Sequence, residues 1–116
     1  MRLIITRGQN KGMMGAVTFE VKAQVQLTEE ERQVAQHYKL ENEVLLSKKM
    51  INIWGQPTDQ EIKVTVRQLL SGESYKCKDL SEVIGYSESL KTACTTFKSY
   101  LDVARGFGGQ EIFDVG

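Results

Sequence analysis

The sequence predicts an α+β fold in which a mostly antiparallel sheet is covered by one long C-terminal amphipathic helix and by shorter helices. Three observations support this prediction: a long stretch of alternating apolar and polar residues, helix-capping signals at two positions, and an apolar stripe of helical period near the C-terminus. The elements follow in the order β-β-α-β-β-α-β. Hairpins with interposed helices favour an α+β layer of four to six strands over a parallel α/β sheet.

The first two strands are predicted to form a hairpin. Residues 2–6 are a short strand candidate, and residues 16–27 are the clearest strand because apolar residues recur there at every second position. This alternation places one face of the strand on a core and the other in water, as in an antiparallel sheet. The alternating apolar residues are Val17, Phe19, Val21, Ala23, Val25 and Leu27. Residues 8–15, which include three glycines, supply the turn.

A helix is predicted directly after this hairpin. Thr28 and Glu31 have the spacing of a capping box, in which the threonine hydroxyl satisfies a free amide of the first turn and the glutamate reaches back to the cap. The helix is expected to end near residue 39. Its buried side chains are expected to be Val34, Ala35 and Tyr38.

The middle of the chain predicts a second hairpin. Residues 43–54 contain apolar clusters that indicate one bent or interrupted strand, or two short ones. Residues 55–59 combine glycine, the only proline and an aspartate, which is typical of a turn. Residues 61–67 alternate again and form the return strand. Residues 68–72 are expected to make a single helical turn that ends at the glycine.

Two helices are predicted near the C-terminus. Asp79 and Glu82 have capping-box spacing at the start of a short helix that Gly85 ends. The longest helix then covers residues 87–105, because six residues form a continuous apolar stripe on one face. These residues are Leu90, Ala93, Cys94, Phe97, Leu101 and Ala104. Residues 110–115 are a candidate for the last strand.

Composition indicates one ordinary soluble domain. The chain has 116 residues, which suits a single α+β domain over residues 1–116, and 15 basic residues balance 15 acidic ones. A zero net charge gives no general attraction to nucleic acid or to anionic lipid, so we expect neither a nucleic-acid nor a membrane partner. The first apolar run is too short for a signal peptide, and no stretch approaches a membrane span. We therefore expect a cytoplasmic protein.

The glycine-rich segment before the second strand resembles a phosphate-binding loop only superficially. A phosphate loop needs a helix N-terminus behind its backbone amides, whereas this segment leads into a strand. We interpret it as a hairpin turn with Lys11, Met13 and Met14 at its tip. Neighbouring methionines are adaptable contact residues, so this tip is a candidate partner or ligand contact.

We expect no catalytic, metal-binding or cofactor-binding residues. His37 and Glu41 lie four residues apart, but two ligands do not make a zinc site, and the sequence has no second histidine. Cys94 falls within the apolar stripe, where a thiol is normally inert. Cys77 alternates with a tyrosine in a short extended run and is expected to be half buried. These features do not favour an enzyme.

The function that the sequence favours is therefore a non-catalytic interaction domain that self-associates, as a homodimer or larger homo-oligomer, or binds a protein partner. Trp54 would anchor an interface if exposed, although its place at a strand end slightly favours the core. The alternative is a small-molecule-binding protein or enzyme with a pocket between the sheet and the long helix. That pocket would be lined by Tyr38, Trp54, Tyr75 and Tyr100.

Overall fold

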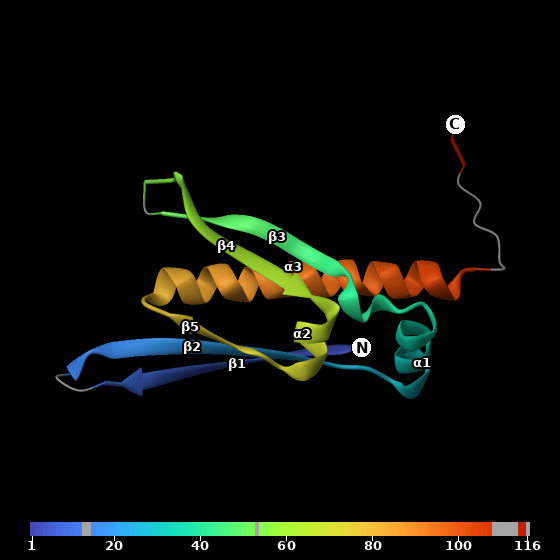
Figure 1. The fold of residues 1–116 in the computed structure, drawn as a ribbon, viewed down its shortest axis with the longest axis horizontal. Coiled ribbons are helices and arrows are strands. Elements are labelled where there is room, and N and C mark those ends of the chain that lie inside the picture. Colours follow the sequence, from blue (N-terminus) through green and yellow to red (C-terminus); the bar gives the residue numbers. More distant parts are fainter. Residues whose placement is uncertain (13–14, 53, 108–113, 116) are drawn as a thin grey trace.

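The computed structural model of the chain describes residues 1–12, 15–52, 54–107 and 114–115. It has the predicted α+β fold (Figure 1). In chain order the elements are β1 (Arg2–Lys11), β2 (Val17–Gln26), α1 (Glu29–His37), the short 3-10 helix η2 (Leu40–Asn42), β3 (Val44–Ile51), β4 (Pro57–Thr65), α2 (Val66–Ser71), β5 (Ser74–Cys77) and α3 (Leu80–Arg105). Most of the strand predicted over residues 110–115 lies outside the described residues.

The first hairpin is confirmed, and its first strand is longer than predicted. β1 and β2 pair antiparallel without interruption, from Arg2 opposite Gln26 to Lys11 opposite Val17. The strand therefore continues through Gly8 and Lys11, which the sequence assigns to the turn, because pairing with β2 holds them extended. β5 pairs with the other edge of β2, so the strand order of this sheet is β1-β2-β5.

The strands are divided between two sheets, because β3 and β4 form a separate antiparallel pair. The chain leaves β4 at Thr65, where a second capping box begins α2. The Thr65 hydroxyl accepts a hydrogen bond from the Gln68 N–H (3.3 Å), and the Gln68 side chain accepts one from the Thr65 N–H (2.8 Å). The strand predicted over residues 61–67 therefore ends two residues early. It also begins four residues early, at Pro57, so the turn predicted over residues 55–59 is too long at its C-terminal end. α2 ends at Gly72, as predicted, with a φ of 78°.

The two helices predicted near the C-terminus are one helix. α3 begins after its cap residue Asp79 and continues without a break through Gly85, so the helix end predicted at this glycine is wrong. A glycine inside a helix costs roughly 1 kcal/mol relative to alanine. Packing on both sides of the glycine offsets that cost, because Val83 and Leu90 are both buried. The predicted end at residue 105 is confirmed.

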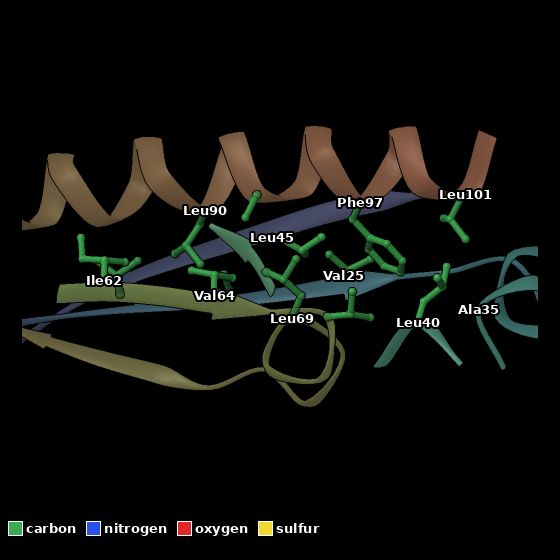
Figure 2. Packing of buried hydrophobic residues seen from close by; sticks show 14 of the residues in the cluster. Val25, Ala35, Leu40, Leu45, Ile62, Val64, Leu69, Leu90, Phe97 and Leu101 are labelled. Atoms are coloured by element: carbon green, nitrogen blue, oxygen red, sulfur yellow. The ribbon is translucent and has the colours of Figure 1, made fainter. Parts of the chain in front are cut away.

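The core lies between α3 and both sheets. Figure 2 shows Leu90, Phe97 and Leu101 directed from α3 toward the strands, and Phe97 is fully buried. The residues that oppose them belong to β2, β3, β4 and α2, and include Val25, Leu45, Val64 and Leu69. The apolar stripe of the long helix is thus confirmed. Because a single core joins both hairpins to α3, it fixes where each hairpin lies along the helix.

The capping box of α1 is confirmed, but not the burial of its last predicted core residue. The Thr28 hydroxyl accepts a hydrogen bond from the Glu31 N–H (3.2 Å), and the Glu31 carboxylate accepts one from the Thr28 N–H (2.9 Å). Ala35 is buried and Val34 is partly buried. Tyr38 is 39% exposed, and the helix ends one residue before it, so Tyr38 does not continue the buried face of α1.

Candidate functional site

Four large apolar side chains are exposed at one end of the molecule. Trp54 (78% exposed) and Ile51 (68%) lie at the turn between β3 and β4. Leu80 (64%) and Ile84 (62%) lie in the first two turns of α3. Figure 1 shows this turn and the start of α3 at the same end of the long axis. We call these four residues the tip surface. Exposed apolar side chains that gather in one part of a surface often mark contact sites, so the tip surface is a candidate contact site.

The turn that carries Trp54 is held by Asn52. The Asn52 side-chain oxygen accepts hydrogen bonds from the backbone N–H of Trp54 (2.9 Å) and of Gln56 (3.0 Å). Gly55 supplies the left-handed conformation that closes the turn, with a φ of 76°. The sequence favours a buried Trp54, and this is wrong, because the indole lies beyond the last strand pair (Ile51 opposite Pro57), where the sheet ends.

A groove of about 610 Å³ lies between the β3–β4 hairpin and the first turns of α3. The alternative function predicted from the sequence also has a pocket between a sheet and the long helix, and it stays a prediction. Lys48, Lys49 and Lys78 line it, together with Asp79 and Glu82. The two carboxylates bond to backbone N–H groups at the start of α3, at 2.9 and 2.8 Å. Asp79 thus caps the Glu82 N–H in the first turn of α3, and Glu82 bonds to the N–H of Lys78, just before the cap residue.

The predicted contact residues of the first hairpin are only partly described. Lys11 is the last residue of β1, lies opposite Val17 and is exposed. Met13 and Met14 lie outside the described residues. The β1–β2 turn is at the same end of the long axis as the β3–β4 turn (Figure 1). Lys11 and Trp54 are thus carried by two different hairpins at one end of the molecule, and their role in a contact remains a prediction.

A second cavity of about 610 Å³ is formed by β2, α1, η2 and α2, without α3. Sequence reasoning missed it because its walls come from four separate elements. The predicted aromatic residues line neither this cavity nor the groove at the tip. Among them, Tyr38 borders an open depression along α1. The one local signal for the second cavity is the pair Arg32 and Gln36, which are four residues apart and therefore share one face of α1.

Both cysteines of the chain are free thiols. Burial raises the pKa of the Cys77 thiol, which is 3% exposed and more buried than expected, and burial also raises the pKa of Cys94. Tyr75 stacks on Tyr86 with ring centroids 5.1 Å apart, and burial raises the pKa of Tyr75 to about 12. Among the described residues, no group of three or more histidines, cysteines or carboxylates could hold a metal ion.

No protein-family model matches the chain, and neither the curated proteins nor the solved structures include a significant match. Within the part of the chain that the structure describes, no helix has the length and apolar character needed to span a membrane.

Proposed function

We propose that this protein is a non-catalytic interaction domain and that the tip surface is its contact site. The observation that carries the proposal is the exposure of Trp54, at 78%, on a turn held by two hydrogen bonds from Asn52. Tryptophan is the residue most enriched among the energetically dominant contacts of protein interfaces. A rigid turn presents it without a large loss of conformational entropy on binding.

The surroundings of Trp54 indicate the chemistry of the partner. Ile51 adds apolar area at the same turn, and Lys48 and Lys49 precede it on β3. The matching surface would therefore combine an apolar depression with acidic side chains at its rim. An interface with an apolar centre and a charged rim has the usual anatomy of a protein–protein contact.

We propose a second copy of the chain as the partner, and a different protein is the alternative partner. Residues 44–78, which contain the β3–β4 hairpin, carry six basic and three acidic residues. Residues 28–43, which contain α1, carry five acidic and two basic residues. Figure 1 places α1 and the β3–β4 turn at opposite ends of the long axis. Opposite charge in two separate parts of the chain supports association between copies, because complementary potentials steer encounter and suppress wrong orientations.

Trp54 is the only tryptophan, so its fluorescence reports on this surface directly. We expect light scattering to show a mass above that of one chain as concentration rises. Over the same range, Trp54 should become less accessible to a soluble quencher such as acrylamide. Trp54→Ser should abolish the rise in mass. A single-chain mass and full quencher access at every concentration would exclude self-association through this surface.

A matched pair of substitutions on α3 tests whether the tip itself is responsible. Ile84 and Val103 lie on the same helix and are 62% and 63% exposed, but Val103 is near the opposite end. Ile84→Ser should weaken association, whereas Val103→Ser should leave it unchanged. An equal effect of both substitutions would indicate unspecific apolar association and would contradict the assignment to the tip surface.

A further inference from the structure

The cavity between β2, α1, η2 and α2 has the size of a small-molecule site and is open to solvent, because its lining residues Gln24, Gln26, Arg32 and Gln36 are exposed. Its volume of about 610 Å³ falls within the range of about 300–1,000 Å³ that is typical of ligand pockets. Leu27, Ala35 and Leu70 supply apolar surface in it. Gln24, Gln26 and Gln36 add amide groups, each of which both donates and accepts hydrogen bonds.

Two opposite charges line this cavity without pairing. Arg32 enters it from α1 and Glu41 from η2. Among the described residues, neither side chain takes part in an ion pair within 4.0 Å. Other charged groups nearby do pair, such as Arg105 with Glu30 at 3.1 Å. One cavity thus offers a cation and an anion, and both remain available to a ligand.

Local features of the backbone hold the walls of the cavity in place. The capping box at Thr28 fixes where α1 begins, and so directs Arg32 and Gln36 to one side. Two residues after the lining residue Leu70, Gly72 has a φ of 78°, and a Cβ there would lie 3.3–3.4 Å from the Gln24 side chain. The Gln24 amide in turn donates a hydrogen bond to the Leu70 carbonyl oxygen (3.5 Å). These contacts fix the start of α1 and the position of the Gln24 side chain relative to α2.

We propose that this cavity binds a small zwitterion that carries an ammonium and a carboxylate group, namely a free α-amino acid or a short peptide. Arg32 holds the carboxylate, for which a guanidinium is suited because its N–H groups form a planar fork. Glu41 holds the ammonium group. The glutamine amides bind the remaining polar atoms, and Leu27 and Leu70 contact an aliphatic side chain.

The test compares four ligands that differ in one feature each. L-leucine has both charges, L-leucinamide lacks the carboxylate, N-acetyl-L-leucine lacks the ammonium group, and L-leucylglycine places the two charges farther apart. Binding to the isotopically labelled full chain is followed by the chemical shifts of backbone amides. We expect L-leucine or L-leucylglycine to change the chemical shifts of the backbone amides of residues 24–27 and 32–36. Each singly charged analogue should bind at least about tenfold more weakly, as expected when a charge-assisted hydrogen bond is lost. The tighter of the two zwitterions identifies a free amino acid or a peptide as the ligand.

Substitutions then assign the two charges. Arg32→Met should make L-leucine bind no better than L-leucinamide, and Glu41→Gln should remove the preference over N-acetyl-L-leucine. Lys63→Met, on β4 and outside the cavity lining, serves as the control and should change neither preference. Three results would overturn the proposal: no shifts with any ligand up to its solubility limit, equal binding of all four, or shifts confined to the groove at the tip. These results do not depend on self-association, which Trp54→Ser tests separately.

Discussion

Glu31 offers the sharpest test of how this fold is held together, because it joins three parts of the chain. It is only 5% exposed. Its carboxylate accepts hydrogen bonds from the Thr28 N–H (2.9 Å) and pairs with the Met1 amino group (3.0 Å) and the Arg105 guanidinium (3.3 Å). The N-terminal segment, the start of α1 and the end of α3 therefore meet on one carboxylate. We predict that Glu31→Gln destabilises the protein through loss of its charge.

The magnitude follows from what glutamine keeps and what it loses. A glutamine still accepts the hydrogen bond from the Thr28 N–H, because capping boxes form with either residue. It loses the two charge-assisted contacts to Met1 and Arg105, and hydrogen bonds to charged groups contribute about 1.5–3 kcal/mol each when buried. Arg105 keeps its contact with Glu30, so only part of that amount is lost there. We expect the free energy of unfolding to fall by about 2 kcal/mol.

The effect should depend on pH in a defined direction. Burial raises the pKa of Glu31, but hydrogen bonds from the Thr28 N–H and the Met1 amino group outweigh it and hold the pKa below its usual value. A carboxyl group with a lowered pKa in the folded state stabilises the protein above the unfolded-state pKa of about 4.3. That contribution is lost as the pH falls through the folded-state pKa. The difference between the wild type and Glu31→Gln should therefore be largest at neutral pH and shrink in acid.

Urea unfolding followed by circular dichroism measures this difference, since the helices lose their signal on unfolding whereas Trp54 is already exposed. Glu30→Gln is the matched control: Glu30 is the neighbouring residue and contacts the same Arg105, but its side chain is 73% exposed. Exposed ion pairs contribute about 0–1 kcal/mol. Equal destabilisation by the two variants would refute the reasoning. So would a Glu31→Gln effect that stays constant from neutral to acid pH.

Three further predictions concern packing, backbone conformation and reactivity. Gly85→Ala should stabilise the protein by about 1 kcal/mol, because Gly85 lies inside a helix and an added Cβ meets open space. Gly72→Ala should destabilise the protein by about 1–2 kcal/mol, because the φ of Gly72 is 78°. Thermal unfolding of both variants checks that the two effects have opposite signs. Phe97→Ala should cost about 3–5 kcal/mol, because Phe97 is fully buried between α3 and the strands. A loss below about 1 kcal/mol in urea unfolding would contradict the core described above. Cys77, whose pKa burial raises, should react with Ellman's reagent slowly in native buffer and rapidly in denaturant; equal rates would show that the thiol is accessible in the folded state.

The parts of the fold that the sequence predicted well have local causes. The alternation in residues 16–27 and the Thr28–Glu31 capping box each act within a few residues, and the structure has both. The helix end predicted at Gly85 failed because the signal there is weak: roughly 1 kcal/mol for glycine competes with the packing of a 26-residue helix. The start of α2 was missed although its signal was present. Thr65 and Gln68 have capping-box spacing, but they follow an alternating stretch that continues the strand pattern.

The candidate sites were harder to predict than the fold, because they depend on contacts between distant segments. The second cavity needs β2, α1, η2 and α2 together, and nothing in the local sequence of one element specifies the other three. The division into two sheets is likewise a consequence of where α2 turns the chain. The glycines near Lys11 were enough to predict a hairpin turn there. The length of β1, however, is set by its pairing with β2.

Trp54 shows how a single contact can decide between a structural and a functional role. Burying its side chain would stabilise a protein of this size by roughly 2–3 kcal/mol, so an exposed tryptophan forgoes a substantial part of a total stability of about 5–15 kcal/mol. A flexible turn would let the indole pack against its own hairpin and recover some of this stabilisation by burying apolar surface. Instead, Asn52 bonds to the backbone on both sides of Gly55 and holds the turn in the conformation that leaves Trp54 78% exposed. The energy forgone in the monomer is then available when a partner covers the indole. Asn52→Ala should therefore weaken self-association even though Asn52 itself is not part of the tip surface. If light scattering showed unchanged association, the hydrogen bonds of Asn52 would not be needed to present Trp54 to the partner.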